Sequence, residues 1–133
     1  MEIILKTENK YEVKDITKEV AEFISVSKLK EGICTVFVKH TSCAITITEN
    51  YDPNIGKDLV NALDKLIPEG VWLHDKIDNN GSAHIKSAIL GPSEIIPVRG
   101  GELLLGKWQN IVLCEFDGPK KRKILVNLCK PAM

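Results

Sequence analysis

The sequence predicts a single α+β domain over residues 1–133, with an antiparallel-rich β-sheet packed by about three helices. Short β-branched and apolar runs separated by turn residues recur along the chain, which is typical of buried strands. Between them lie longer segments whose apolar residues recur every three or four positions, which indicates helices. A chain of 133 residues that is 44% hydrophobic can build one core.

The N-terminal third is predicted to begin with a β-hairpin followed by a helix. The runs EIILK (residues 2–6) and KYEVK (10–14) flank a short polar turn, which is the pattern of two paired strands. Apolar residues then keep helical spacing from Thr17 to about Leu29. Asp15 or Thr17 is in place to cap that helix.

Two strands and the clearest helix come next. ICTVFVKH (33–40) and CAITIT (43–48) are β-branched and apolar, which predicts buried strands. Asp52 followed by Pro53 is a favourable helix start, and apolar residues then recur at helical spacing until Pro68. We therefore predict a helix over residues 53–67.

The C-terminal half is predicted to hold a shorter helix and four strands. Ser82 would cap that helix, Gly91 would end it, and Ile85, Ala88 and Ile89 would form its inner face. The four strands are the runs EIIPV (94–98), ELLLG (102–106), QNIVLCEF (109–116) and KRKILVNLC (121–129).

Composition excludes several classes of function. Eighteen basic and eighteen acidic residues give zero net charge, so no overall field draws the chain to nucleic acid or to an anionic membrane. The start has no apolar run of signal-peptide length and no window is long enough to span a membrane, which predicts a cytoplasmic protein. The four cysteines form no C-x-x-C pair and are expected to be reduced, mostly core thiols.

The three histidines, His40, His74 and His84, each stand at the end of a predicted element beside Thr, Ser, Asn or Asp. Three imidazoles with an open fourth position are typical of catalytic zinc, so one hypothesis is that they converge on a divalent metal, zinc or magnesium, or on a bound anion. His84 would lie in the first turn of its helix, near backbone N–H groups that favour anions. The alternatives are a core histidine at His40 and plain turn chemistry around Asn79.

An opposite-charge pair is predicted near the C-terminus. If EFDGPKKR is a hairpin, Glu115 faces Arg122 at the end of an otherwise apolar face. One reading is a semi-buried structural ion pair. The other is a fork that binds a phosphate or carboxylate, with Lys120 beside it. The sequence leaves both open.

The spacing of these polar residues also suggests an oligomer. If Thr41 and Ser42 turn a tight hairpin, Asn50 lies on the order of 20 Å from His40 along the strands. One subunit would not bring both into one pocket, whereas a second copy could. This favours a site at a subunit interface.

Taken in order, HTS (40–42), ENYDP (49–53), H…DNNGSAH (74–84), GKWQ (106–109) and EFDGP…R (115–122) resemble the YjbQ family. The resemblance implies a small α+β protein that assembles as a homotrimer. It also implies a secondary thiamine-phosphate synthase reaction, a transferase step that joins a pyrimidine diphosphate to a thiazole phosphate and releases pyrophosphate.

By this resemblance the polar motif positions would line the family's pocket. They are His40, Thr41, Ser42, Asn50, Asp52, His74, Asn79, His84, Gln109, Glu115, Asp117 and Arg122. One position departs from the pattern, because Lys120 follows the proline where arginine is expected. It keeps the charge but lacks the planar fork.

The resulting hypothesis is an enzyme acting on a small phosphorylated molecule. The three histidines and Glu115 would be its catalytic groups, while Arg122 and Lys120 would bind phosphate. The competing hypothesis is a non-enzymatic trimeric protein that binds a metal or ligand in the same pocket.

Overall fold

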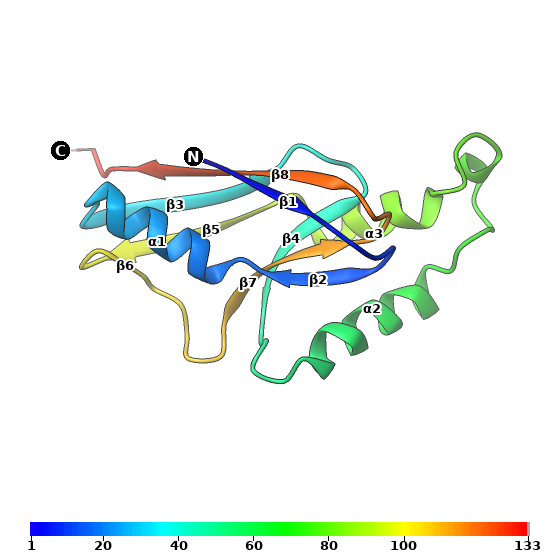
Figure 1. Cartoon of the computed structure of the whole chain (residues 1–133), viewed down its shortest axis with the longest axis horizontal. Helices are drawn as coiled ribbons and strands as arrows, with labels where there is room; N and C mark the ends of the chain where they lie inside the picture. Colours follow the sequence, from blue (N-terminus) through cyan, green and yellow to red (C-terminus); the bar gives the residue numbers. More distant parts are fainter. Residues whose placement is uncertain (133) are drawn as a thin grey trace.

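Eight strands form two antiparallel sheets in the computed structural model, which describes residues 1–132 (Figure 1). The five-stranded sheet has the order β1 (Glu2–Lys6), β8 (Lys121–Cys129), β3 (Glu31–Val38), β5 (Ser93–Arg99), β6 (Glu102–Leu103). The three-stranded sheet has the order β2 (Glu12–Asp15), β7 (Asn110–Glu115), β4 (Cys43–Thr48). The α+β class and the antiparallel pairing predicted from the sequence are confirmed.

Three helices complete the fold: α1 (Thr17–Ser27), α2 (Asn54–Leu66) and α3 (Gly81–Leu90), with a short 3-10 helix η1 (Leu73–Lys76) between the last two. The helix starts follow from the acidic caps. The Asp15 carboxylate accepts the Thr17 N–H at 2.9 Å, and the Asp52 carboxylate accepts the Asn54 N–H at 2.9 Å. The N-cap position of α2 is Pro53, and the Asp52 carboxylate just before it binds the first N–H of the helix.

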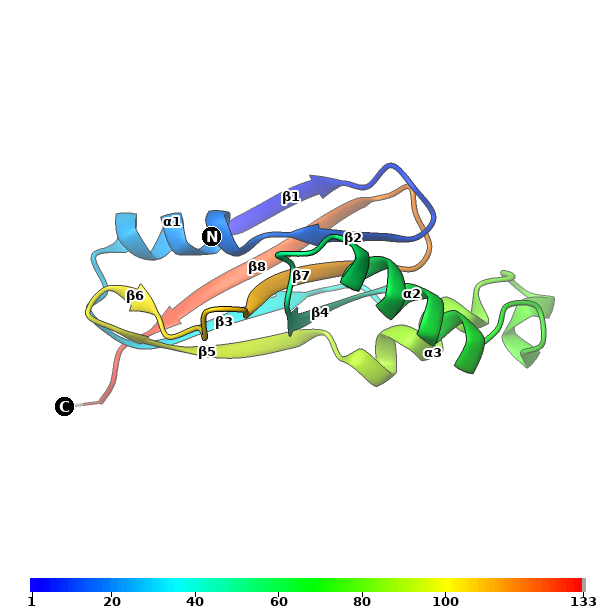
Figure 2. The same ribbon diagram turned by 90° about the horizontal axis from the view of Figure 1, so that it is seen from below.

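The main core lies between the two sheets, with α1 closing one end. Buried side chains from both sheets meet there, including Val36, Ile124, Ile45 and Leu113, together with Val20 of α1. A second cluster forms on the other face of the three-stranded sheet, beneath α2 and α3 (Figure 2). The far face of the five-stranded sheet has no helix on it.

Consecutive strands cross from one sheet to the other, except that β5 and β6 pair directly as a hairpin. The predicted hairpin of the first two strands is wrong, because β1 pairs with β8 and β2 pairs with β7. The hairpin expected around residues 117–120 is also wrong, since β7 and β8 belong to different sheets, and β3 and β4 are likewise split. Each strand has one apolar face, and stacking the two sheets buries these faces against each other.

The third helix buries a different face from the one predicted. Its N-cap is Asn80, and Ser82 lies inside the helix, where its hydroxyl donates to the Ile67 carbonyl at 2.7 Å. Lys86 is fully buried, whereas Ile89 is 64% exposed. The apolar pattern misled here because the buried face of α3 is built around an ion pair, described below.

Other elements agree with the sequence more closely. The predicted run 102–106 contributes only a two-residue strand, while the strands 43–48 and 121–129 have the predicted bounds. Three of the four free cysteines are buried, as expected, and Cys129 is exposed. Among residues 1–132, no helix is long and apolar enough to cross a membrane.

Candidate functional site

The candidate site is built where three of the sheet-to-sheet connections meet. These are residues 7–11, 39–42 and 116–120, which lie at the same end of the stacked sheets. Backbone hydrogen bonds tie them together: the Thr7 N–H donates to the Lys120 carbonyl at 2.9 Å, and the Phe116 N–H donates to the Ser42 carbonyl at 3.2 Å. The crossing topology thus collects residues that are far apart in the sequence.

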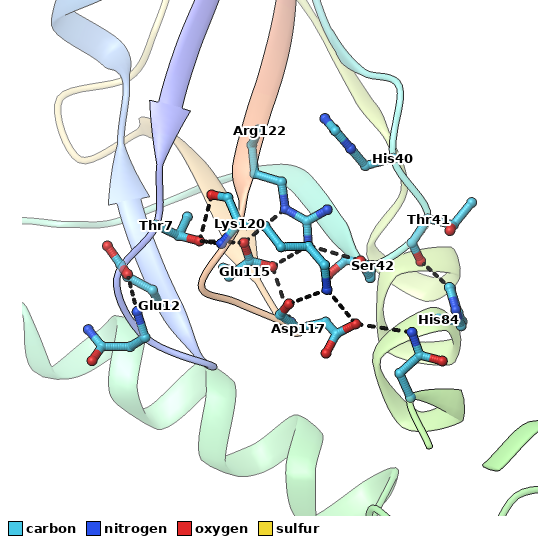
Figure 3. Close-up of polar contacts among 12 residues, drawn as sticks. Thr7, Glu12, His40, Thr41, Ser42, His84, Glu115, Asp117, Lys120 and Arg122 are labelled. Atoms are coloured by element: carbon cyan, nitrogen blue, oxygen red, sulfur yellow. Dashed lines mark hydrogen bonds and ion pairs between the residues drawn. The ribbon is translucent and has the colours of Figure 1, made fainter. Parts of the chain in front are cut away.

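An ion pair between Glu115 and Arg122 spans the two sheets in this region (Figure 3). The Arg122 Nε donates to one Glu115 oxygen at 2.8 Å and Nη2 donates to the other. The same Nη2 donates to the Ser42 hydroxyl at 2.9 Å and to the Ser42 carbonyl at 3.1 Å. Glu115 is 0% exposed and Arg122 is 2% exposed. The predicted contact is present, although the predicted hairpin is not.

Both Glu115 oxygens are fully used inside the protein. Besides Arg122, they accept the Thr7 hydroxyl at 2.7 Å and the Asp117 N–H at 3.1 Å. The side chain therefore has no free acceptor with which to touch a ligand, and its role is to hold Arg122 in place. Arg122 has one nitrogen, Nη1, without a hydrogen-bond partner among residues 1–132, on the side where His40 lies (Figure 3).

A second polar cluster adjoins this pair. The Lys120 ammonium donates to the Asp117 carboxylate at 2.8 Å, and the Asn80 amide donates to the same carboxylate at 3.0 Å. Burial would raise the pKa of Asp117, but these two hydrogen bonds outweigh it and the pKa is lowered. Asp117 thus links the turn after β7 to the start of α3, and Lys120 is engaged with it.

A cavity of about 770 Å³ opens beside these clusters, and all three histidines line it. His40 and Thr41 come from the connection after β3, His84 comes from α3, and His74 comes from η1. The rest of the lining is mainly apolar, and it comprises Trp72, Leu73, Ile85, Ala88 and Pro92 with the buried Cys43. An apolar pocket with a few convergent polar groups is the usual form of a small-molecule site.

Hydrogen bonds fix the protonation of two of the histidines. The His84 Nδ1 lies 2.9 Å from the Thr41 carbonyl, which can only accept, so Nδ1 carries a proton, and in the neutral ring Nε2 is left as the acceptor. His40 has the same neutral tautomer but engages its other nitrogen, because its Nε2 accepts the Lys123 N–H at 3.0 Å. A neutral His40 therefore carries its proton on Nδ1.

The surroundings of His40 favour negative charge on a ligand. Burial lowers the pKa of His40, and the nearby charge of Arg122 lowers it further, with smaller effects in the same direction from Lys123 and Lys39 and an opposing one from Glu115. His40 is thus held neutral at neutral pH among cations. The same burial raises the pKa of the Cys43 thiol to about 11, so that thiol is protonated.

His74 is held by a compact segment that we call the arm, residues 66–80. The Asp75 carboxylate accepts the Gly81 N–H at 2.8 Å and the Trp72 N–H at 3.1 Å. These bonds lower the pKa of Asp75. The same two hydrogen bonds hold the His74 ring beside the His84 ring, with ring centroids 5.0 Å apart in an edge-to-face arrangement.

One chain does not form the three-histidine metal site. Among residues 1–132 no three His, Cys, Asp or Glu side chains are arranged to hold a metal ion. The physical reason is visible at His40, whose Nε2 is occupied by the Lys123 N–H while His74 and His84 face each other. Two imidazoles remain together, which is fewer than the three protein ligands of a catalytic zinc site.

Four of the predicted site residues lie outside the cavity. The length of β4 separates Asn50 and Asp52 from Ser42, and Gln109 lies at the same distant end because Thr48 pairs with Asn110. Asn50 donates to Asp15 at 3.0 Å and Gln109 accepts the Gly106 N–H at 2.7 Å, which are local contacts. Asn79 adopts a left-handed turn conformation, with φ of 51°. None of these lines the histidine cavity.

The apolar lining was not identified from the sequence. Trp72 and Leu73 gave no periodic signal because the arm is irregular. The sequence placed Ile85 and Ala88 in the core. They do not lie on the side of α3 that buries Lys86, and they form part of the cavity wall instead.

Comparison with known proteins gives a consistent result. The family described as UPF0047 protein YjbQ-like matches residues 1–131. A UPF0047 protein of Methanocaldococcus jannaschii is 43% identical over 93% of this chain and 89% of its own length. The UPF0047 protein YugU of Bacillus subtilis is 37% identical over 93% of this chain and 94% of its own.

Solved structures share the fold throughout. A hypothetical protein from Aeropyrum pernix superposes with a TM-score of 0.94 at 36% identity, covering 98% of both chains. A YbjQ-like protein of unknown function from Sulfolobus solfataricus superposes with a TM-score of 0.93 at 36% identity, over 96% of this chain and 94% of that one.

Proposed function

This chain belongs to the UPF0047 YjbQ-like family, and on that premise we propose that it is an enzyme acting on a small phosphorylated molecule at the histidine cavity. One observation carries the proposal. His40 and His84 line one apolar cavity with different ring nitrogens already hydrogen-bonded, so that the neutral rings leave an N–H donor at His40 Nδ1 and an unprotonated nitrogen at His84 Nε2. That combination suits general acid–base chemistry.

The ligand is expected to have a charged end and an apolar end. Its phosphate would lie beside His40, where Arg122, Lys123 and Lys39 supply positive charge. Its apolar part would pack on Trp72, Leu73 and Ile85. An aromatic or heterocyclic phosphate ester fits this arrangement.

The roles of the residues follow from their contacts. His84 Nε2 would take a proton from the attacking group, while the Thr41 carbonyl keeps the ring in the required tautomer. His40 Nδ1 would donate a hydrogen bond to a phosphate oxygen. Glu115 would act as a positioning residue for Arg122, not as a catalytic residue. A transfer that releases pyrophosphate, as in thiamine-phosphate synthesis, is one reaction of this class.

We also propose that the protein works as a homotrimer with the cavity at a subunit interface. Two observations support self-association. The far face of the five-stranded sheet carries exposed apolar side chains, and the polar cluster around Asn50 lies too far from the cavity to serve it within one chain. Sedimentation equilibrium of the untagged protein would measure the number of copies.

The alternative is a non-enzymatic protein that binds zinc through His74 and His84. Their rings, 5.0 Å apart, supply two nitrogen ligands, which suit zinc better than the oxygen-preferring magnesium. The remaining ligands would have to come from a second copy or from the bound molecule.

The test is a binding and turnover assay with phenyl phosphate and phenyl pyrophosphate as probes. Wild type should bind at least one probe, and His84→Ala should reduce turnover by about 10²–10⁴-fold. Ile89→Ala is the matched control, since Ile89 lies on the same helix, is exposed and does not line the cavity. Absence of both binding and turnover in wild type would refute the proposal.

A further inference from the structure

One buried hydroxyl in the wall of the histidine cavity lacks a hydrogen-bond partner. Ser87 of α3 lines the cavity and is 5% exposed, and its Oγ is bonded to no group among residues 1–132. In that part of the chain the other buried side-chain atom in this condition is Asn80 Oδ1, and Asn80 does not line the cavity. Buried polar groups in folded proteins are nearly always hydrogen-bonded, so an exception in a cavity wall points to a partner outside the chain.

The helix itself does not supply that partner. A serine inside a helix commonly donates to the carbonyl four residues earlier, which for Ser87 is the carbonyl of Ala83, and that hydrogen bond does not form here. Ser82 lies on the same helix and is 3% exposed, and its hydroxyl donates to the Ile67 carbonyl at 2.7 Å. The unpaired state is therefore a property of the Ser87 position and not of buried serines on α3.

The surroundings of Ser87 are neutral and largely apolar. Its neighbour Ala88 lines the same wall, and the Cys43 thiol there is protonated because burial raises its pKa to about 11. The ammonium of Lys86 is engaged by Asp64 at 2.8 Å. A lone hydroxyl in such a wall offers a donor to a neutral acceptor, but it brings no charge to match a phosphate.

The position of Ser87 along α3 separates it from the proposed reacting group. Ser87 follows His84 by three residues, so the two lie on one face of the helix, with Ser87 about 4.5 Å further along the axis. The phosphate is expected beside His40, and the ring of the ligand on the apolar wall. A serine hydroxyl turns about a single bond, which lets it meet an atom of that ring.

Exposure distinguishes Ser87 from the other hydroxyl among the lining residues, that of Thr41. Thr41 is exposed, so a ligand that contacts its hydroxyl replaces water and gains little. The Ser87 hydroxyl is buried and unpaired, so a ligand that satisfies it gains a hydrogen bond without displacing one. Recognition of a neutral acceptor is therefore concentrated at Ser87.

We propose that Ser87 is a specificity residue whose hydroxyl donates a hydrogen bond to a neutral acceptor on the ring of the ligand. The cavity then prefers an aromatic phosphate whose ring carries such an acceptor over the plain phenyl ester, by about tenfold in Kd for one neutral hydrogen bond. This deepens the proposed function by naming a feature of its substrate, and it rests on that function.

Calorimetric titration with four esters of the same shape tests the assignment. They are phenyl phosphate and the pyridin-2-yl, pyridin-3-yl and pyridin-4-yl phosphates, at a pH at which the ring nitrogen is unprotonated. In wild type at least one pyridyl ester should bind about tenfold more tightly than phenyl phosphate. In Ser87→Ala that preference should disappear, while the Kd of phenyl phosphate stays within about twofold. Ser82→Ala is the matched control and should keep the preference, because Ser82 is a buried serine of the same helix that does not line the cavity.

A second measurement separates this role from a structural one. Because the Ser87 hydroxyl has no partner among residues 1–132, Ser87→Ala removes no hydrogen bond and should leave the urea midpoint of unfolding unchanged or raised. Ser82→Ala should lower that midpoint, since it removes the hydrogen bond to the Ile67 carbonyl. A Ser87→Ala variant as destabilised as Ser82→Ala would mean that the hydroxyl is already paired, and would overturn the proposal.

Two results of the titrations would refute the role of Ser87 and leave the proposed function standing. One is a wild type that binds phenyl phosphate at least as tightly as every pyridyl ester. The other is a preference for a pyridyl ester that survives in Ser87→Ala. A wild type that binds none of the four esters would refute the role of Ser87 and the proposed function together.

Discussion

Arg122 and Glu115 face each other across the gap between two different sheets, not across a hairpin. The guanidinium reaches Glu115 through two nitrogens and ties Ser42 into the same network, with both charged groups almost completely buried. A charge pair in this position joins β7 to β8 and fixes the connections that form the wall of the site. Its removal should therefore affect the whole fold.

Glu115→Gln should lower the free energy of unfolding by about 3–5 kcal/mol, because it leaves the Arg122 charge buried without its counter-ion. Urea denaturation followed by tryptophan fluorescence measures it. Glu69→Gln is the control, since the Lys10–Glu69 pair is about half exposed and should contribute less than about 1 kcal/mol. Equal effects of the two variants would mean that the buried pair contributes no more than a surface pair.

The sequence predicted this pair, although the hairpin from which it was predicted does not form. Side chains alternate between the two faces of a strand. This alternation places Glu115 and Arg122 on the inward faces of their strands, whether the two strands pair side by side or stack in two sheets. Local patterns therefore identified which residues point to the core, and the helix caps at Asp15 and Asp52. They could not tell a hairpin from a crossing between sheets, because that depends on which distant strand pairs with which.

The candidate site was predictable in part for the same reason. The histidines stood out because each stands at the end of a predicted element beside Thr, Ser, Asn or Asp, and all three do line one cavity. Asn50, Asp52 and Gln109 were grouped with them only by resemblance, and within one chain they lie at the other end of β4. Lys86 was missed altogether, because a lysine in a helix is ordinarily solvated, and its partner Asp64 lies on a different helix.

Lys86 gives the second prediction. Its ammonium is fully buried, 2.8 Å from Asp64 and 4.7 Å from the Tyr11 ring centre, so its alkyl chain packs like a core residue. Lys86→Ala should cost about 2–5 kcal/mol through the cavity that it leaves. Lys86→Met keeps the volume and should cost less than about 1.5 kcal/mol, since the Asp64 side chain is 44% exposed and can be hydrated. Similar losses in both variants would contradict a packing role.

The same pair predicts a pH dependence. The hydrogen bond that Lys86 donates to Asp64 lowers the pKa of Asp64 below the ordinary value of 3.8. The folded carboxylate thus binds its proton less readily than the unfolded one. Its contribution to stability is present above that ordinary value and is lost as the pH falls through the lowered pKa. Lys86→Met should therefore lose less stability than wild type between pH 5 and pH 2, and carboxyl NMR should show the Asp64 pKa raised in the variant.

Gly81→Ala should disturb the arm. The new Cβ would lie 2.8 Å from the Trp72 Cβ and 2.9 Å from an Asp75 oxygen, and both atoms are fixed by the hydrogen bonds at the base of the arm. We expect a loss of about 1–3 kcal/mol from overpacking, in spite of the better helix propensity of alanine. Gly56→Ala is the matched helix variant, because its Cβ would meet only the Val13 side chain, at 3.2 Å or more. Thermal unfolding should show a smaller loss for Gly56→Ala.

The ring nitrogens of His40 and His84 carry the proposed acid–base chemistry, and metal content separates it from the metal-binding hypothesis. The Thr41 carbonyl holds the proton on Nδ1 and leaves Nε2 free, and His40 has its own Nε2 bonded to the Lys123 backbone. ¹⁵N NMR of the neutral imidazoles should therefore show the Nδ1–H tautomer for both residues. We also expect elemental analysis of the untagged oligomer to find far less than one zinc per chain, and chelator treatment to leave turnover unchanged. About one zinc per chain, lost in a still folded His74→Ala, His84→Ala variant, would instead support the metal-binding protein.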